Sequence, residues 1–478
     1  MSSVLIAVAA LSLTQAPVAL APGEPAIRKM TMDDCVREAL GASGQMMEQR
    51  GKIREWEGRL KEVESTFWPK LQGLTYLAPI YGVKAVNAPS LYHVPTSYVR
   101  DFSSWGPYFK FQGILAQPLG TFGRYDSGKE AATERIEVQK AMYESARNAL
   151  ALEVRKYYLL HLYAKSFLPS LDLANRLLKE AQTKAEEEFK TGSGSVTQVD
   201  LNKLKYGGGE LAKAQIQADI GAKLALAALK HTMGMPQNAP IDVVDTVLPP
   251  IPNDALKPLA TYIDRAAERR PEVAQLFHGE KAARAFKRAE MFSSNPTAFV
   301  AAQLDLNWTP MWPVQDNPWA FERFNLISPG VAAGLQFDID IAKSLAREYG
   351  AQGLVEQIEG LKKFAATGIP MEVRKAYDDT VQAELMARIA DEQSSAGKKW
   401  LVFAGAGYAA GTGEAKDVLE GLVAYMGAKR GLYDALQAVH LARATLHYAT
   451  GSTGLEDPPQ NHQPKVEAKS DVKSEASP

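Results

Sequence analysis

The chain consists of two copies of one sequence unit, placed one after the other. The run Glu153-Val154-Arg155-Lys156 recurs as Glu372-Val373-Arg374-Lys375, roughly 220 residues later. A second match, at nearly the same offset, aligns the segment Asp200–Gly234 with the segment Asp417–Gly451. A chain of 478 residues that is largely one doubled unit is therefore expected to fold as a repeated architecture rather than as several unrelated domains.

The repeat divides the chain into segments. We expect a secretory signal peptide at 1–21, a first repeat at 30–235, a proline-rich linker at 236–258, a second repeat at 259–452 and a disordered polar tail at 453–478. The signal peptide is inferred from a short apolar stretch, Val4 to Leu13, and from the small residues of Ala19-Leu20-Ala21 at the expected cleavage site.

Each repeat has the same predicted order of one helix, two strands and two long helices. The first helices are predicted at Met32–Phe67 and Leu259–Ser293, each ended by a proline that favours extended backbone before it. Helical periodicity then continues from Lys129 to Lys190, a rod of about 90 Å at 1.5 Å per residue. In the helices that follow, apolar and small residues step by three and four, which is typical of a coiled-coil seam.

The predicted strands alternate between an apolar and a polar face. Between Thr297 and Thr309, apolar side chains such as Leu304 alternate with polar ones such as Gln303. Segments of about ten residues with this pattern suit tilted transmembrane strands, although a half-buried sheet of a soluble protein would alternate in the same way. Aromatic residues near the strand ends fit a membrane-interface belt: Tyr92, Tyr98, Trp105, Trp312, Trp319 and Phe321.

The number of strands predicts an oligomer. Four strands per chain cannot close a barrel, and open sheet edges are not tolerated in lipid. Three copies would supply twelve strands, an even number within the range of known membrane barrels. The expected fold class is thus an α+β membrane protein with an internal two-fold repeat, in which a trimeric 12-stranded transmembrane β-barrel continues into a long α-helical coiled-coil barrel.

Other functional classes find little support. The net charge of −1 and the absence of a basic stripe argue against a nucleic-acid partner. No arrangement of residues predicts an enzyme or a cofactor site, and His440 and His447, seven residues apart, are interpreted as packing residues rather than a metal pair. The single cysteine, Cys35, allows no intramolecular disulfide and is expected to be buried on a helix.

Several motifs resemble the TolC family of outer-membrane efflux and secretion channels, over residues 30–452. They are Tyr408-Ala409-Ala410-Gly411-Thr412 and Asp417-Val418-Leu419-Glu420 in the second repeat, Phe189-Lys190-Thr191-Gly192 with Val196-Thr197 in the first, and Arg270-Pro271. The resemblance implies a homotrimer in outer-membrane lipid, a helical tunnel in the periplasm and a closed inner tip. It also implies docking to a periplasmic adaptor and an inner-membrane pump, as in a tripartite efflux pump or a type I secretion system.

The resemblance also implies roles for single residues. Asp417 and Glu420 match the acidic pair of the periplasmic constriction, although solvated carboxylates are common on any coiled coil. Tyr408 matches a tyrosine that holds the tip shut, but Gly413 and Gln198 replace its usual basic and acidic partners. Closure is therefore expected to rest on other contacts.

The two predicted hairpin turns have a second interpretation. Gly192 and Thr197 in the first turn, and Gly411 and Thr412 in the second, match the tips that family adaptors touch. The glycines are equally well explained as ordinary helix C-caps. The competing class for the whole chain is a periplasmic coiled-coil adaptor or scaffold, which would also carry a long helical hairpin.

Overall fold

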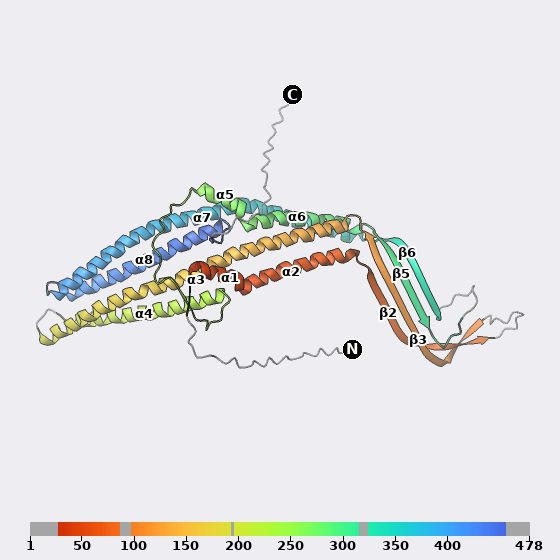
Figure 1. Ribbon diagram of the computed structural model, residues 1–478, viewed down its shortest axis with the longest axis horizontal. Helices are drawn as coiled ribbons and strands as arrows, with labels where there is room; N and C mark the ends of the chain where they lie inside the picture. Colours follow the sequence, from red (N-terminus) through yellow and green to blue (C-terminus); the bar gives the residue numbers. More distant parts are fainter. Residues whose placement is uncertain (1–26, 87–96, 193–195, 315–323, 456–478) are drawn as a thin grey trace, which may run out of the picture.

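The computed structural model describes residues 27–86, 97–192, 196–314 and 324–455. Long helices extend to one end of the molecule and a sheet lies at the other (Figure 1). The predicted signal peptide, 1–21, lies outside the described residues, as does the tail beyond Leu455.

The two halves of the chain contain matching elements in the same order. The first half contains β1 (Arg28–Met30), α1 (Met32–Ala42), α2 (Gly44–Glu64), β2 (Lys70–Val86), β3 (Ser97–Gly120), α3 (Arg124–Thr191) and α4 (Gln198–Thr232). The second contains β4 (Ile241–Val243), α5 (Leu259–Arg269), α6 (Pro271–Met291), β5 (Thr297–Trp308), β6 (Leu326–Gln336), α7 (Ile341–Ala409) and α8 (Ala415–Ala449). Among these helices, none has both the length and the apolar character needed to cross a membrane.

The first helix of each half is broken, so the prediction of one continuous helix was wrong in both. Ser43 separates α1 from α2: its backbone is extended, and its hydroxyl accepts a hydrogen bond from the amide of Gln45 (3.2 Å). In the second half, Pro271 opens α6 and Arg270 before it is extended, as the residue preceding a proline tends to be. A serine N-cap thus marks the break in the first half, whereas the break in the second half has a local cause, the proline at the first helical position.

The sheet contains four antiparallel strands in the order β2-β3-β5-β6. Its central pair, β3 and β5, joins the two halves, with Phe109 opposite Trp308 and Leu115 opposite Ala302. The second-half strands have 12 and 11 residues, close to the expected ten. Those of the first half are longer than predicted, at 17 and 24 residues, because β2 and β3 pair beyond a bulge at Tyr81 and Gly82.

The long helices form two hairpins that share an apolar core. The predicted seam is confirmed in α4, where Leu204, Leu211 and Leu229 are buried, and in α8, where Val418, Tyr425 and Leu446 are buried. Near the turns, one cluster combines residues of both hairpins. The helical end of the molecule is therefore held together by the same stripes that the sequence displays.

The proline-rich segment packs against other elements and does not merely connect the two halves. Its strand β4 pairs in parallel with β1, with Met30 opposite Val243. The amide of Leu248 donates to the hydroxyl of Ser166 on α3 (2.8 Å), and Leu248 is buried.

Cys35 joins the same core, as predicted, and burial raises the pKa of its thiol to about 12. The last described residues are also ordered, since Arg155 donates to the carbonyl of Thr453.

Candidate functional site

The predicted site residues lie in the two turns that end the helical hairpins, at the end of the molecule opposite the sheet (Figure 1). In the first turn, Gly192 ends α3 with a φ of 64°, which favours glycine. Thr197 begins α4 as its N-cap: the amide of Asp200 donates to its hydroxyl (3.3 Å), and its own amide donates to the Asp200 carboxylate (3.1 Å). Both residues therefore have a local structural role.

The second turn is tighter. Gly411 has a φ of 76°, and the amides of Thr412 and Gly413 both donate to the carbonyl of Gly407 (3.0 Å each). A Cβ atom at Gly413 would lie 3.1 Å from the backbone of Gly407 and of Tyr408. A side chain at this position would thus require the end of α7 to shift by a few tenths of an ångström, which favours glycine here.

Asp417 and Glu420 are exposed one turn apart at the start of α8. The amide of Glu414 donates to the Asp417 carboxylate (3.4 Å), so this side chain helps to cap the helix. Glu420 lies 3.6 Å from the ammonium of Lys416, in a pair whose side chains are both about half exposed. The geometry of one chain thus leaves both carboxylates open to solvent.

Three residues join the two hairpins just above these turns; we call them the tip cluster: Lys184 and Glu188 of α3 and Tyr408 of α7. The Tyr408 hydroxyl donates to Glu188 Oε2 (3.3 Å). The Lys184 ammonium donates to the carbonyls of Tyr408 and Ala409, lies 4.6 Å from the Tyr408 ring centroid and is 3.7 Å from Glu188. Burial and the Glu188 carboxylate raise the pKa of Tyr408 to about 12, so the hydroxyl remains a hydrogen-bond donor at neutral pH.

The tip cluster forms a charged contact between the two hairpins within one chain. Lys184 occupies carbonyls at the C-terminal end of α7, where a helix leaves acceptors unsatisfied and attracts positive charge. Sequence reasoning missed both charged members of the cluster. A signal was present, because Lys184 and Glu188 are spaced by four residues and precede Gly192 by about two turns and one turn of helix.

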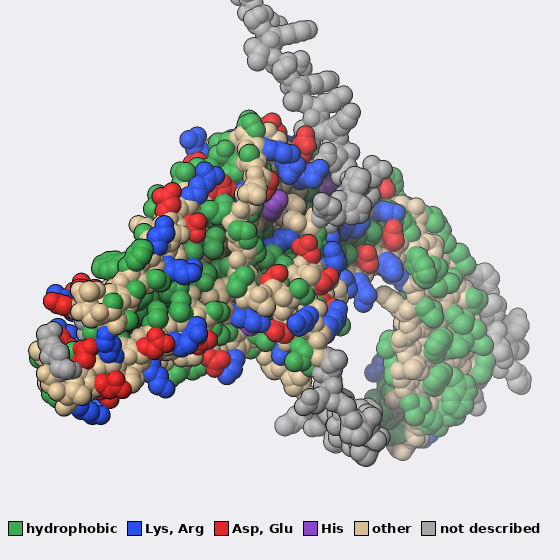
Figure 2. Space-filling model, turned by 60° about the vertical axis from the view of Figure 1, so that its left-hand side comes forward, with side chains coloured by type: hydrophobic (Ala, Val, Ile, Leu, Met, Phe, Trp, Pro, Cys, Tyr) green, Lys and Arg blue, Asp and Glu red, His purple; other side chains and the backbone are tan. Residues whose placement is uncertain are grey.

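One face of the sheet is apolar and exposed. A cross-strand row runs through Leu71, Leu115, Ala302 and Val331. Leu71 is 77% exposed and Val331 is 81% exposed. Figure 2 shows hydrophobic side chains gathered over the sheet, whereas charged side chains are scattered over the helices. A face this apolar on a single chain calls for an apolar environment or a partner.

The opposite face of the sheet is more polar. Its rows include Gln112 opposite Asp305 and Lys110 opposite Asn307. The Tyr108 hydroxyl donates to Asn307 Oδ1 (2.9 Å). The alternation predicted from the sequence is therefore present, with both faces now assigned by register.

Of the aromatic residues predicted to form a belt, Tyr92, Trp319 and Phe321 lie outside the described residues. Trp105 and Trp312 both contact Tyr81, with ring centroids 6.3 and 6.2 Å away, near the end of the sheet that is distant from the helices. Trp105 is 57% exposed. These two residues thus form part of an aromatic cluster at that end.

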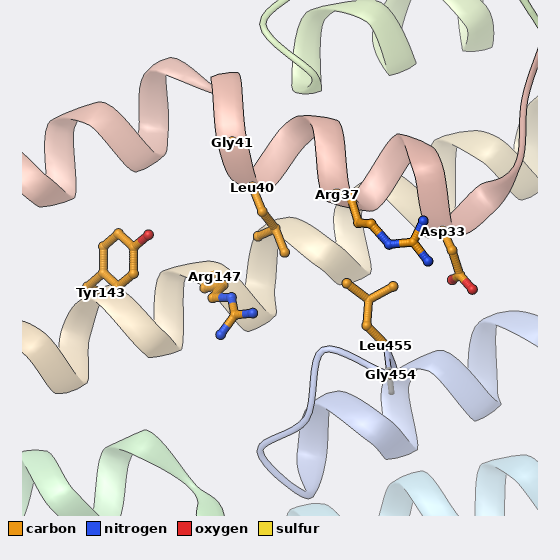
Figure 3. A pocket seen from close by; sticks show the side chains of 8 residues that line it. All are labelled: Asp33, Arg37, Leu40, Gly41, Tyr143, Arg147, Gly454 and Leu455. Carbon is orange, nitrogen blue, oxygen red and sulfur yellow. The ribbon is translucent and has the colours of Figure 1, made fainter. Parts of the chain in front are cut away.

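Two further features of the described residues bear on other kinds of site: their His, Cys, Asp and Glu side chains, and the groove between α1 and α3. Among the described residues, no three His, Cys, Asp or Glu side chains gather as metal ligands would, and His440 Nε2 donates to the carbonyl of Pro249 (3.0 Å). An open groove of about 920 Å³ includes Leu455 in its lining (Figure 3). Two arginines in this lining already have carboxylate partners, since Arg37 pairs with Asp34 (3.0 Å) and Arg147 with Glu144 (3.2 Å).

The fold, a helical double hairpin joined to a four-stranded sheet, is similar to that of solved outer-membrane channel proteins. A membrane protein from Pseudomonas aeruginosa is 16% identical over 88% of this chain and 93% of its own, with a TM-score of 0.70. The CmeC outer membrane channel of Campylobacter jejuni is 16% identical over 88% of this chain and 85% of its own, with a TM-score of 0.69. The outer membrane protein VceC of Vibrio cholerae is 13% identical over 88% and 96%, with a TM-score of 0.66.

At the level of sequence, no family model and no curated protein matches the chain. The predicted resemblance is nevertheless confirmed by structure: the chain has the fold of the TolC-family channels, over nearly all of its described length.

Proposed function

We propose that this protein is an outer-membrane channel, in which three copies form a passive exit duct across the outer membrane and the periplasm. The observation that carries the proposal is the exposed apolar face of the sheet, with Val331 81% and Leu71 77% exposed. In water such a face would favour aggregation, whereas in a bilayer it is the surface that lipid requires. The shared fold with known outer-membrane channels supports the same role.

The edges of the sheet support a trimer. Within the described residues, the outer edges of β2 and β6 have no neighbouring strand. In lipid these edge groups must be paired, because no water is present to satisfy them. Pairing of β2 of one copy with β6 of the next, three times, gives a closed barrel of twelve strands. The long helices of three copies would then continue the barrel as a tunnel in the periplasm.

In this proposal the chain exports its cargo together with a periplasmic adaptor and an inner-membrane pump, in a tripartite efflux or type I secretion system. The signal peptide 1–21 directs export, and the repeats 30–235 and 259–452, joined by the linker 236–258, each supply one hairpin and two strands. Gly192, Thr197, Gly411 and Thr412 form the tips that the adaptor contacts. A periplasmic adaptor or scaffold is not favoured, because in the aqueous periplasm the apolar face of the sheet would be exposed to water.

Membrane location and trimerisation are tested together in cells that produce the chain with its signal peptide. We expect the mature protein in the outer-membrane fraction, migrating as a heat-sensitive trimer. The physical reason is that unpaired β2 and β6 edges are costly in lipid until three copies close the barrel. Fractionation, electrophoresis with and without heating, and mass determination in detergent provide the measurements. A stable monomer in the outer membrane, or a soluble periplasmic protein, would contradict the proposal.

Asp417 and Glu420 are proposed to line the periplasmic constriction, where threefold symmetry would gather six carboxylates. The double variant Asp417→Asn, Glu420→Gln is expected to lose most of the cation preference and the sensitivity to trivalent cations, because a ring of carboxylates favours cations. The amide side chains preserve the size of both residues, and Asn can still accept the hydrogen bond from Glu414. Bilayer recordings of ion selectivity and of block by a trivalent cation measure the effect.

A matched control removes the same number of charges elsewhere. Glu210 and Asp219 are exposed on α4, away from the turn, and each pairs with a lysine on the same helix. Their replacement by Gln and Asn should leave selectivity unchanged. If the tip variant and this control behave alike, Asp417 and Glu420 act only as solvated capping and surface residues.

A further inference from the structure

The hairpin of β2 and β3 extends beyond the rest of the sheet. Pairing between β3 and β5 ends at Phe109 and Trp308, whereas β2 and β3 continue to pair as far as Val86 and Ser97. A bulge after Tyr81 separates this extension from the main sheet. The extension lies at the end of the molecule most distant from the helices (Figure 1). In the proposed channel it therefore stands at the outer surface of the outer membrane.

Arg100 lies on the extension, on the same side as the apolar face. Leu77, Pro79 and Tyr81 occupy alternate positions of β2, so their side chains lie on the apolar face. Tyr81 is paired with Trp105 of β3. The Arg100 guanidinium lies 5.9 Å from the centroid of the Tyr81 ring. The cation is thus placed directly beyond the apolar face rather than over the polar one.

A packed aromatic platform lies beneath this cation. The Tyr81 ring lies 5.1 Å from Phe102 and 6.3 Å from Trp105, centroid to centroid. Trp312 approaches from the segment after β5, and its indole Nε1 donates to the carbonyl of Tyr81 (3.1 Å). Phe102 and Trp105 nevertheless remain 62% and 57% exposed. The platform is therefore held in place by Trp312, while its Phe102 and Trp105 rings remain open to the surroundings.

Among the residues that the structure describes, no neighbour neutralises the positive charge of Arg100. The adjacent carboxylate, Asp101, is bound to the ammonium of Lys84 (2.8 Å) and accepts from the amide and hydroxyl of Ser103 (3.0 and 2.5 Å). Within the part of the chain that the structure describes, no carboxylate lies within 4.0 Å of the Arg100 guanidinium. A free guanidinium next to an exposed apolar and aromatic surface is available for an anionic ligand.

We infer that Arg100, with Phe102 and Trp105, binds a phosphate group of the phosphorylated glycolipid in the outer leaflet of the outer membrane. This inference rests on the proposed function. Aromatic residues at the edge of an apolar band lie at headgroup depth, so a guanidinium directly beyond them is level with lipid phosphates. The guanidinium fork matches the geometry of phosphate, and the exposed rings offer flat surfaces to the sugar of the headgroup. Three such sites would surround the trimer.

The test compares wild-type trimer with two variants in detergent. Arg100→Gln removes the guanidinium that is proposed to bind the phosphate. Lys110→Gln removes a cation of the same strand that faces the polar side. Each is mixed with lipid A carrying two phosphates, and bound lipid is counted by native mass spectrometry. We expect wild type and Lys110→Gln to retain the lipid, and Arg100→Gln to bind about tenfold more weakly, as the loss of one hydrogen-bonded charge contact predicts.

Further arms identify the chemistry of the ligand. Dephosphorylated lipid A should bind wild type as weakly as phosphorylated lipid A binds Arg100→Gln, and inorganic phosphate should not compete at millimolar concentration. Equal binding by wild type and Arg100→Gln, or equal binding of phosphorylated and dephosphorylated lipid A, would overturn the inference. So would phosphatidylglycerol binding as tightly as lipid A, because the ligand would then be any anionic lipid. Trimer insertion and conductance of Arg100→Gln separate this inference from the channel proposal: a variant that inserts and conducts as wild type does, yet binds lipid A equally well, overturns this inference and leaves the channel proposal intact.

Discussion

Replacing Leu304 with arginine is expected to prevent the channel from accumulating in the outer membrane. Leu304 lies on the apolar face near the middle of β5, opposite Gly113 on one side and Pro329 on the other. An arginine at the bilayer midplane of a membrane barrel costs about 2–4 kcal/mol, and a trimer incurs this cost three times. Because about 1.4 kcal/mol changes an equilibrium tenfold, the amount of heat-sensitive trimer should fall by well over tenfold. Electrophoresis of outer-membrane fractions measures it.

The neighbouring position offers a control with the same change of side chain. Gln303 lies on the opposite face of β5, in the row that includes Ile114 and Gly330. In the proposed barrel Gln303→Arg faces water in the lumen, so its insertion should be close to that of wild type. Equal trimer yields for the two arginine variants would mean that the apolar face does not contact lipid, and the membrane proposal would fail.

In the proposed channel, replacing Lys184 with methionine is expected to favour an open tip. Methionine retains much of the side-chain volume but removes the ammonium that bonds to the carbonyls of Tyr408 and Ala409. A hydrogen bond to a charged group contributes about 1.5–3 kcal/mol, so each chain should shift toward the open arrangement by roughly tenfold or more. We expect higher single-channel conductance in planar bilayers and greater entry of large antibiotics into cells that produce the variant.

Lys179 provides the matched control, because it is exposed on the same helix and lies outside the tip cluster. Lys179→Met removes the same charge and should leave conductance at the wild-type level. Lys184→Arg should retain most of the closed state, since its guanidinium can still donate to the two carbonyls. If Lys184→Met conducts as wild type does, the tip cluster is a packing contact and closure depends on other residues.

The features predicted correctly from the sequence are those with local causes. The hairpin turns are an example: Gly192 and Gly411 adopt positive φ, as C-cap glycines do, because glycine has no Cβ to clash there. The alternation in β5 is another, since successive side chains of a strand point to opposite faces whatever the strand packs against. The roles of Asp417 and Glu420 at a constriction remain a prediction.

The break between α1 and α2 shows where this reasoning had limits. A serine at position 43 is compatible with either a continuous helix or an N-cap, because its hydroxyl can bond to backbone in both. Packing of both helices against α3 decides between the two. The break before Pro271 could have been read from the sequence, since the residue before a proline avoids helical geometry.

What the sequence by itself determined is the period of each segment, and with it the long helices, the two-faced strands and their caps, because these depend on residues within one or two turns of each other. Only the tertiary structure decided which distant residues meet. It brings Lys184 to Tyr408, pairs β1 with β4, and places Gly207 where a Cβ would lie 3.1 Å from Leu419, so that glycines unfavourable to an isolated helix allow α4 to approach α8. Such contacts join segments far apart in the chain, and their free energy depends on how whole helices pack, which no local pattern encodes.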